Sequence, residues 1–435
     1  MSTLIEVACA KVLEKVETKM ISIRGALEDY VKLDKSIAAV RDVVLSLCLG
    51  TVRNYILIDT LLTHVGLNVN KLDSFQRNLL RVIAYELKFR DIPVDRVRKC
   101  LKYVKVRVNF NDVLSIRDIS IEDIVRDLDT VTRLSVRYSI PKWLVSYLMQ
   151  HFPETEVENM LRAFNEKAPM YIRVNISKIS REELVRRLCR YNIKLEEDPD
   201  LPDVVKVLEL GVRLESVEEY RKGLFYIQDK ASALVGHVVK RFVDNVELVL
   251  DVCSAPGGKT MHISELYNRK VRVVALDVSY RRILTENDLL HKYGYENVDL
   301  VCANSLRLPT LDRRVDVIIV DPDCTSLGKL AHSPEVRLWI RKHHINEYAR
   351  HQYKLLRSLV MKYRGKSRYL IYSTCTITLE ENEYNIQKIM NEFGIELVNI
   401  DKYFSKFSNS LMPGTLRLLP HIHGTNGYFI ALLRL

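Results

Sequence analysis

Apolar residues recur every three or four positions through the first 135 residues, which is the spacing of one face of an α-helix. The clearest series lie within residues 37–47 and 75–87. Glycine is almost absent from this part of the chain, and Pro93 marks a junction between two helices. We therefore predict an all-α domain over residues 1–135.

A strongly basic segment follows that junction, at residues 94–108. Val97, Leu101 and Val104 recur at helical spacing, so the segment is predicted to be a helix with an apolar stripe. The only acidic residue is Asp95, and the basic residues are Arg96, Arg98, Lys99, Lys102, Lys105 and Arg107. A solvated surface would explain this pattern, but charge of one sign favours contact with RNA phosphates.

The pattern changes over residues 136–225, which we predict to form a small α/β module. Residues 170–175 alternate between apolar and polar side chains in the manner of a strand. Ser180, with Glu183 three residues later, has the form of a capping box. A helix is therefore predicted from there toward Cys189.

From about residue 226 strands and helices alternate, which predicts a parallel sheet with helices on its faces. The predicted strands are 247–252, 271–277, 299–303, 315–321 and 369–374, with a final antiparallel pair at 395–400 and 427–433. The G-x-G-x-x-G fingerprint of dinucleotide dehydrogenases is missing. Residues 226–435 are therefore predicted to be a Rossmann-like α/β domain with a seven-stranded sheet.

Length and charge fit a multidomain protein with a polyanionic partner. The chain has 435 residues, too many for one ordinary hydrophobic core. Its 66 Lys and Arg residues exceed its 55 Asp and Glu residues, which gives a net charge of +11. This balance suits a nucleic-acid-binding protein or a merely basic enzyme, and charge alone does not separate the two.

Other features of the composition concern location and cysteine chemistry. No run approaches the ~20 apolar residues of a membrane span. The N-terminus lacks the pattern of a signal peptide, so we expect a cytoplasmic protein without a membrane partner. The eight cysteines are scattered and include no C-x-x-C pair. Reduced thiols are expected, rather than a disulfide framework or a metal site.

A glycine-rich turn follows the first predicted strand of the C-terminal domain. Asp251 ends that strand, and residues 255–258 are Ala-Pro-Gly-Gly. Glycine lets a bulky ligand approach the backbone, and Lys259 adds a cation. The Walker pattern G-x-x-x-x-G-K-[S/T] is absent, which argues against a nucleoside triphosphate site.

Asp277 ends the second predicted strand. An acid at this point can bind both hydroxyls of a ribose, although it also suits the start of the helix that follows Ser279. The glycine-rich turn and this acid together favour S-adenosylmethionine (SAM), whose methionine end would meet the turn and whose ribose would meet the acid.

Two cysteines stand at the ends of later strands. Cys324 lies in Val-Asp-Pro-Asp-Cys, and Cys375 lies in Tyr-Ser-Thr-Cys-Thr. The carboxyl ends of parallel strands share one edge of a sheet with the cofactor loop, so we expect both thiols beside a bound cofactor. There they suit covalent catalysis, and the alternative is a pair of buried structural thiols.

These motifs, in this order, resemble the Sun-type (RsmB/Nop) family of SAM-dependent RNA cytosine-5 methyltransferases. The matching stretches are 251–260, 321–328 and 372–383, with support from 225–232 and 420–429. The resemblance implies that Cys375 adds to carbon 6 of cytosine and that Cys324 assists release of the product. Asp321 and Lys259 are expected to act at the same base.

The resemblance also implies a set of residues around the cofactor. They are Cys253, Ser254, Ala255, Pro256, Gly257, Gly258, Lys259, Asp277, Arg282, Asn304 and Asp321.

The N-terminal region resembles the NusB-like helical domain, which is fused to some RNA methyltransferases, over residues 41–53 and 79–93. The middle module is RRM-like. We expect a monomer that acts on rRNA or tRNA, with rRNA favoured by analogy with the NusB-like domain.

Three positions depart from the family pattern. Asp323 stands where proline is usual, Asn304-Ser305 stands where the third strand normally ends in an acid, and Asn426 replaces a common acid. A catalytically decayed methyltransferase fold that serves as an RNA-binding or assembly factor is therefore the main alternative. A nitrogen methyltransferase is disfavoured, because residue 324 is a thiol where that class needs an aromatic side chain.

Overall fold

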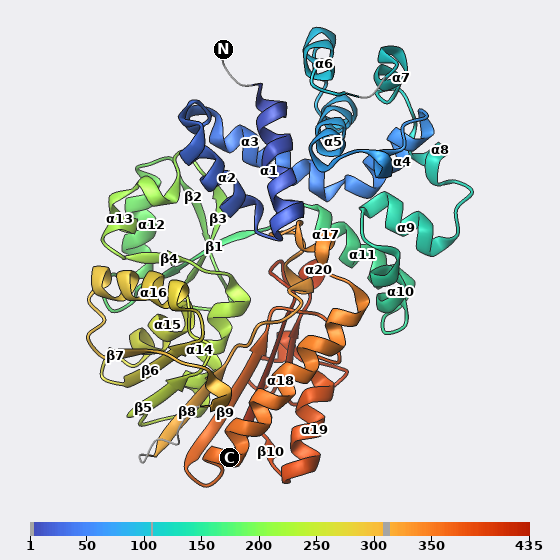
Figure 1. Ribbon diagram of the computed structural model, residues 1–435. Coiled ribbons are helices and arrows are strands. Elements are labelled where there is room, and N and C mark those ends of the chain that lie inside the picture. Colours follow the sequence, from blue (N-terminus) through green and yellow to red (C-terminus); the bar gives the residue numbers. More distant parts are fainter. Residues whose placement is uncertain (1–3, 106–107, 308–313) are drawn as a thin grey trace. The chain divides into compact units, whose positions relative to one another are not determined.

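The structure is a computed structural model that describes residues 4–105, 108–307 and 314–435 (Figure 1). The chain forms two compact units, Met1–Lys167 with Lys329–Lys342 and Ala168–Gly328 with His343–Leu435. The domain boundaries predicted near residues 135 and 225 stay predictions. Among the described residues, no helix combines the length and the apolar character that crossing a membrane requires.

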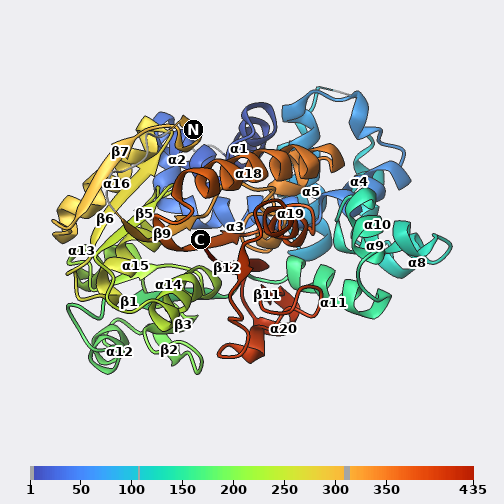
Figure 2. The ribbon, with the colours of Figure 1, turned by 90° about the horizontal axis from the view of Figure 1, so that it is seen from below.

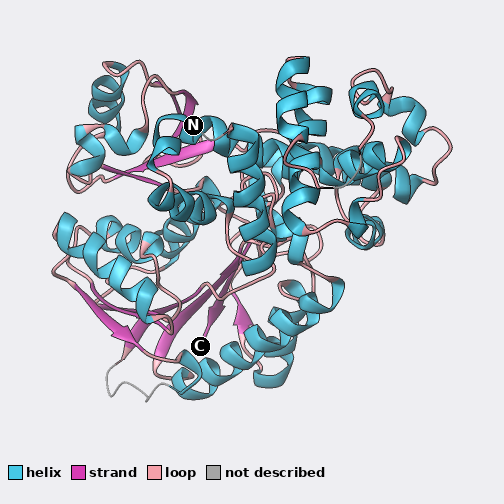
Figure 3. Ribbon diagram, turned by 45° about the horizontal axis from the view of Figure 1, so that its top comes forward, coloured by secondary structure: helices cyan, strands magenta, loops and turns pink. Residues whose placement is uncertain are grey.

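The first unit is built from helices, with no strand among its described residues (Figure 3). The helices are α1 (Ile5–Lys19), α2 (Ile23–Leu33), α3 (Arg41–Arg53), α4 (Tyr55–His64), α5 (Ser74–Phe89), α6 (Val94–Leu101), α7 (Phe110–Ser115), α8 (Ile121–Val125), α9 (Thr130–Tyr138), α10 (Lys142–Met149), α11 (Glu154–Asn165) and α17 (Val336–Trp339). The apolar stripes of α1, α2, α3 and α5 meet in one core, to which Leu13, Leu27, Leu47 and Val82 belong. The predicted all-α region is confirmed.

The prediction of one basic helix over residues 94–108 is wrong in its extent. Helix α6 ends at Leu101, because the N–H groups of Tyr103 and Val104 bond to carbonyls three residues earlier and the Lys105 N–H donates to the Gln76 side chain at 3.2 Å. These hydrogen bonds end the α-helix. The spacing of apolar residues in the sequence could not predict them. Arg107 lies outside the described residues.

The basic side chains of this segment differ in their contacts. Arg96 forms an ion pair with the buried carboxylate of Glu6. The side chains of Arg98, Lys99 and Lys102 are exposed. The exposed positive charge is therefore smaller than the sequence indicated.

One segment of the first unit comes from much later in the chain. Residues 329–342 follow strand β8 (Val315–Val320) and precede helix α18 (Lys342–Tyr363), yet they pack with the N-terminal helices. The guanidinium of Arg337 is fully buried and donates to the carbonyls of Arg53 and Ser139, each at 3.1 Å, and to the Asn165 side chain at 2.9 Å. Removal of this segment would leave those backbone acceptors unpaired.

The second unit contains a large mixed sheet covered by helices on both faces (Figures 1 and 2). The strands are β5 (Leu248–Asp251), β6 (Arg272–Asp277), β7 (Val298–Cys302), β8, β9 (Ser367–Thr374), β10 (Glu396–Leu397), β11 (Leu416–Leu418) and β12 (Tyr428–Arg434). The helices are α14 (Lys230–Phe242), α15 (Gly258–Leu266), α16 (Tyr280–Tyr293), α18, α19 (Glu383–Phe393) and α20 (Pro420–His423). The strand order is β10-β12-β9-β8-β5-β6-β7, and β11 pairs with β12.

The central strands are apolar on both faces, as expected for a buried parallel sheet. In β8, Val317 and Ile319 join the core beneath α14 and α15, whereas Ile318 and Val320 join the core beneath α18 and α19. The five predicted parallel strands are confirmed to within two residues. The predicted strand at 395–400 is reduced to β10, and β11 was not predicted.

The second unit also contains the small α/β module. Its elements are β1 (Met170–Val174), α12 (Arg181–Cys189), β2 (Lys194–Glu197), β3 (Val204–Glu209), α13 (Glu218–Arg221) and β4 (Phe225–Ile227). The strands form an antiparallel sheet of order β2-β3-β1-β4. The predicted cap is present, since the Ser180 side chain accepts from the Glu183 N–H.

The two faces of this smaller sheet are both covered. Ile172 and Val174 pack with apolar residues of α12. On the other face Tyr171 joins the core of the large sheet, and Arg173 forms a fully buried ion pair with Glu265 of α15. RRM domains use the corresponding open face to stack bases, and that face is closed here.

Candidate active site

The two predicted thiols meet at the ends of neighbouring strands. Strands β8 and β9 run parallel, with Val320 paired to Tyr372, so the residues after each strand lie side by side. The Sγ atoms of Cys324 and Cys375 are 3.2 Å apart, and both side chains are partly exposed. Two thiols at this distance can act on adjacent atoms of one substrate.

Glycine allows the two cysteine loops to approach each other. The Gly328 N–H donates to the Cys375 carbonyl at 3.1 Å, and the Gly427 N–H donates to the Gly328 carbonyl at 2.9 Å. A Cβ atom on Gly328 would lie 2.0 Å from the Gly427 oxygen, which no side chain tolerates. The loops after β8 and β9 and the start of β12 are thereby joined by backbone bonds.

A buried carboxylate supports the loop that carries Cys324. Glu381 accepts from the Thr325 N–H at 3.0 Å, from the Thr378 hydroxyl at 2.7 Å and from the Gln352 amide at 2.9 Å. Gln352 also donates to the Asp323 carbonyl at 2.9 Å. Burial raises the pKa of Glu381. Sequence reasoning missed this role, although Glu381 lies within the motif that follows Cys375.

The contact between the thiols affects their acidity. The pKa of Cys324 is well above its ordinary value, first because of its hydrogen bond with Cys375 and then because of burial. Either sulfur can be the donor in this contact, so the two thiols can share one proton. Ser326, whose hydroxyl is 3.7 Å from the Cys375 sulfur, adds a second polar group on this side.

The Asp321 carboxylate lies between the thiols and the glycine-rich turn. Its Oδ2 atom is 2.5 Å from Lys259 Nζ, and its Oδ1 atom accepts from the hydroxyls of Ser373 at 2.9 Å and Tyr428 at 3.1 Å. Burial opposes the charge of Lys259, but Asp321 and Tyr428 raise the pKa of this lysine above its ordinary value. Lys259 is therefore a fixed cation at this edge of the sheet.

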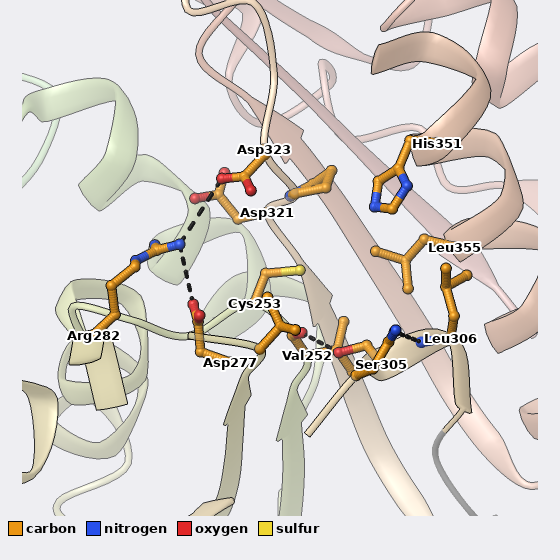
Figure 4. A pocket seen from close by; sticks show the side chains of 13 residues that line it. Val252, Cys253, Asp277, Arg282, Ser305, Leu306, Asp321, Asp323, His351 and Leu355 are labelled. Carbon is orange, nitrogen blue, oxygen red and sulfur yellow. Dashed lines mark hydrogen bonds and ion pairs between the residues drawn. The ribbon is translucent and has the colours of Figure 1, made fainter. Parts of the chain in front are cut away.

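A pocket opens beside this edge, lined in part by five of the predicted cofactor residues (Figure 4). They are Cys253, Asp277, Arg282, Asn304 and Asp321. Asp277 is almost fully buried and accepts from the Ser279 N–H at 2.9 Å. Arg282 lies 3.3 Å from Asp277 and 3.9 Å from Asp323, whose own side chain is 76% exposed.

The predicted residues Ser254, Ala255, Pro256, Gly257 and Gly258 form the turn from β5 into α15. Gly257 has φ +94°, a conformation that favours glycine, and a Cβ there would press on Glu286 at 3.0 Å. Glu286 accepts from the Ser254 hydroxyl at 2.8 Å, and burial raises its pKa to about 7. Sequence reasoning missed Glu286, because its contact with the turn depends on how α16 packs.

The end of β5 supplies a second buried acid. Asp251 accepts from the Thr260 hydroxyl at 2.8 Å, and burial raises its pKa to about 6. Asp251 therefore anchors the start of α15 to the strand.

The far wall of the pocket is largely apolar. Leu306 and Leu355 contribute to it, together with His351 of α18 (Figure 4), and Val278 lines the pocket next to Asp277 in the chain. Asn304 Oδ1 accepts from the Leu306 N–H at 3.0 Å, which leaves its amide N–H group for a ligand. Neither His351 nor Leu355 was predicted, because α18 is distant in sequence from the glycine-rich turn.

Two groups among the described residues have the composition of metal sites. The carboxylate of Asp203 lies 2.6 Å from His237 Nε2 and 2.8 Å from His262 Nε2, so ring N–H groups account for both of its oxygens. The second group is His343, His344 and Glu347 at the start of α18. The expectation of no metal stays a prediction.

Family models match three parts of the chain. Residues 242–434 match the family model described as 16S rRNA methyltransferase RsmB/F. Residues 140–212 match the ferredoxin-like domain of RsmF/B-like methyltransferases, and residues 6–105 match the NusB family. The chain belongs to the RsmB/F family of RNA cytosine-C5 methyltransferases.

Relatives of this RsmB/F protein include bacterial and archaeal enzymes. The chain is 26% identical over 436 residues to the probable ribosomal RNA small subunit methyltransferase B of Bacillus subtilis, covering 97% of this chain and 96% of that one. It is 34% identical over 223 residues to a tRNA (cytosine(72)-C(5))-methyltransferase of Pyrococcus horikoshii, covering 51% and 55%. A crystal structure titled PH0851 superposes with a TM-score of 0.81 at 26% identity, covering 100% of both chains.

The predicted family, fold class and enzyme class are thus confirmed. This RsmB/F protein has a NusB domain, a ferredoxin-like module and a mixed methyltransferase sheet, and its family depends on SAM.

Proposed function

We propose that this protein transfers a methyl group from SAM to carbon 5 of a cytosine in rRNA, through a covalent bond between Cys375 and carbon 6 of the base. The observation that carries the proposal is the 3.2 Å contact between Cys324 and Cys375 beside the pocket lined by Asp277 and Asp321. Two thiols that close are needed when one bonds to the base and the other assists its release.

The pocket has the chemistry that SAM requires. Asp277 offers a buried carboxylate to ribose hydroxyls, and the apolar side chains of Val278 and Leu355 suit the faces of an adenine ring. The Asn304 amide takes the position where the family has an acid. It can donate to a ring nitrogen of adenine, so the substitution does not remove recognition. Bound SAM would supply an electrophilic methyl group.

We assign the nucleophile to Cys375 because the hydrogen bond between the thiols favours it. Cys324 has a raised pKa, so it keeps its proton and shares it with the neighbouring sulfur. That donation stabilises a thiolate on Cys375, and the thiolate is the reactive form. Addition of this sulfur to carbon 6 makes carbon 5 electron-rich enough to accept a methyl group.

Release requires two bonds to break. The proton on carbon 5 must leave, and the bond between Cys375 and carbon 6 must then break to regenerate the thiolate. We assign the assistance of this step to Cys324. As Cys375 adds to carbon 6, ring nitrogen 3 of the base takes the proton of Cys324. The resulting Cys324 thiolate is a strong base because its pKa is raised, and it accepts the proton from carbon 5. Cys375 then leaves as a thiolate, and the proton on nitrogen 3 is lost to solvent.

Asp321 and Lys259 would orient the base. Oδ1 of Asp321 is held by two hydroxyls and Oδ2 by Lys259, which leaves a lone pair of Oδ2 for the amino group of cytosine. A second departure, Asp323, is turned to solvent and toward Arg282, so its charge need not oppose the chemistry at Cys324. This arrangement weakens the case for a decayed enzyme.

The choice of rRNA over tRNA as the substrate rests on how much of the chain each relative matches, and not on the chemistry of the site. The relative that matches almost the whole chain carries a ribosomal RNA name, whereas the relative named for tRNA matches about half of it. We therefore favour rRNA. Phosphate contacts by Arg98, Lys102 and Lys105 remain part of this proposal, because their side chains are exposed.

Bisulfite sequencing of ribosomal RNA from cells with and without the gene tests the proposal. We expect a cytosine that resists deamination only when the gene is present, and purified protein with SAM should restore that resistance to RNA from the deletion cells. As a matched control, Cys189→Ala changes an exposed cysteine on α12 and should methylate normally. Binding of SAM without methylation of any RNA would instead support the decayed alternative.

A further inference from the structure

Cys9 and Cys48 lie together in the core of the first unit and take no part in the chemistry above. Cys9 belongs to α1 and Cys48 to α3, and their Sγ atoms are 2.8 Å apart. Both side chains are 0% exposed and belong to the same apolar cluster as Leu13 and Leu47. The pair is therefore held by the packing of two helices, not by a mobile loop.

The sulfur–sulfur distance is the decisive observation. Nonbonded heavy atoms in a core rest about 3.5–4.0 Å apart, whereas the sulfurs of a disulfide are about 2.05 Å apart. At 2.8 Å, Cys9 and Cys48 are closer than simple contact, and a movement of less than about 1 Å would bring them to bonding distance. The Cys324–Cys375 contact, at 3.2 Å, is longer and partly exposed, whereas the Cys9–Cys48 pair is fully buried and has no role in the proposed catalysis.

We propose that Cys9 and Cys48 form a disulfide that links α1 to α3. This differs from the expectation that all the thiols stay reduced, which rested on the absence of cysteine clusters in the sequence. Spacing could not reveal the pair, because the two residues are 39 positions apart and meet only when the helices pack.

The chemistry is thiol–disulfide exchange with a small or protein disulfide as the oxidant. The two thiols lose their hydrogens and form one S–S bond, while the oxidant's S–S bond breaks to give two thiols. Burial, reinforced by Cys48, raises the pKa of Cys9, so the reactive thiolate is scarce in the folded core. Exchange therefore occurs while the helices are apart, and the closed core then shields the bond from reductants.

The disulfide would constrain the helices against which residues 329–342, the late segment of the first unit, are packed. It closes a loop that contains α2. At the start of α2 the Ile23 N–H donates to Glu335 at 3.3 Å, and Arg24 donates to the His332 carbonyl at 3.2 Å. The disulfide would restrict α1, α2 and α3 in the unfolded chain as well, which is the main source of its stabilisation.

Mass spectrometry of the full-length protein tests the proposal directly. The protein is unfolded, refolded in buffers with a rising ratio of oxidised to reduced glutathione, quenched in acid and alkylated under denaturing conditions. We expect a linked Cys9–Cys48 peptide at the lowest oxidised fractions and six alkylated cysteines instead of eight. The exposed cysteines Cys189 and Cys302 should stay alkylated there. Full alkylation of Cys9 and Cys48 at every ratio would overturn the proposal.

A stability measurement gives a second and independent result. The thermal midpoint of the oxidised protein should fall by several degrees after the bond is reduced under denaturing conditions and the protein is refolded. The Cys9→Ser/Cys48→Ser variant should show no such shift, even if it is less stable throughout. An equal shift in that variant, or none in the wild type, would contradict the proposal. Neither measurement depends on methyl transfer, so failure here leaves the proposed catalytic function untouched.

Discussion

The thiol pair Cys9–Cys48 in the first unit and the pair Cys324–Cys375 in the second have sulfur atoms 2.8 and 3.2 Å apart. Their distances are similar, but their surroundings are not. The first pair is fully buried among aliphatic side chains on two helices. The second is partly exposed beyond the ends of two parallel strands, and the residues just before Cys324 line a pocket.

The difference shows that proximity of two thiols does not determine their chemistry. A pair sealed in a core meets no substrate, and the role proposed for it is a structural disulfide formed before the core closes. An open pair that is polarised by a hydrogen bond and faces a pocket can react with a substrate. The following variants test whether that distinction holds, from the largest expected effect to the smallest.

Cys375→Ala should abolish methyl transfer while SAM binding stays nearly unchanged, because the nucleophile touches the base and not the cofactor. Transfer of a labelled methyl group to RNA and calorimetric titration of SAM measure the two properties separately. Normal turnover by this variant would remove Cys375 from the mechanism.

Cys324→Ala should still form the covalent bond but fail to release the product. A protein–RNA adduct should accumulate and survive denaturing electrophoresis, and Cys324→Ala/Cys375→Ala should give none. If Asp323 accepts the carbon-5 proton when Cys324 is absent, the adduct should decay slowly. Asp323→Pro in the Cys324→Ala background should then lengthen the lifetime of the adduct. An adduct in Cys375→Ala that vanishes in Cys324→Ala would reverse the two roles.

Glu381→Gln should lower kcat by roughly 10–100-fold with little change in SAM affinity. An amide oxygen cannot replace both carboxylate oxygens that hold the Thr325 N–H and the Thr378 hydroxyl, so the Cys324 loop should lose its position. Steady-state kinetics at saturating SAM measure the effect. Glu392→Gln is the matched control, because it makes the same change at an acid of α19 that does not contact the Cys324 loop. Equal rates for the two variants would show that the thiols need no such support.

Cys9→Ala/Cys48→Ala should leave the rate of methyl transfer within about twofold of the wild type below its melting temperature. Removing two buried sulfur atoms should lower the free energy of unfolding by about 1 kcal/mol or more. Neither sulfur takes part in the proposed reaction, so the rate of the folded enzyme should not change. Initial rates measured well below the midpoint of thermal unfolding separate the two effects. A large loss of rate in a fully folded variant would give the sealed pair a catalytic role.

The strand-end residues were predictable because a parallel sheet imposes a fixed geometry on sequence. Cys324 and Cys375 each follow an apolar strand and Asp277 ends one, so their shared edge could be derived from the order of elements alone. Glu381 and Glu286 were missed because their partners, Thr325 and Ser254, are reached only through the packing of other elements.

The helical region shows the same limit. Its period predicted helices correctly, but the end of α6 depends on Gln76, which lies in another helix. The membership of residues 329–342 in that unit depends on Arg337, whose acceptors are scattered from Arg53 to Asn165. No local pattern encodes either of these contacts.

The late segment also has a consequence for synthesis on the ribosome. The N-terminal helices leave the ribosome first, but their unit lacks Arg337 and its neighbours until residue 342 has been translated. Until then the carbonyls that Arg337 caps have only solvent as a partner. The nascent N-terminal region should therefore reach full protease resistance only after most of the chain has been made, even though its own helices come first.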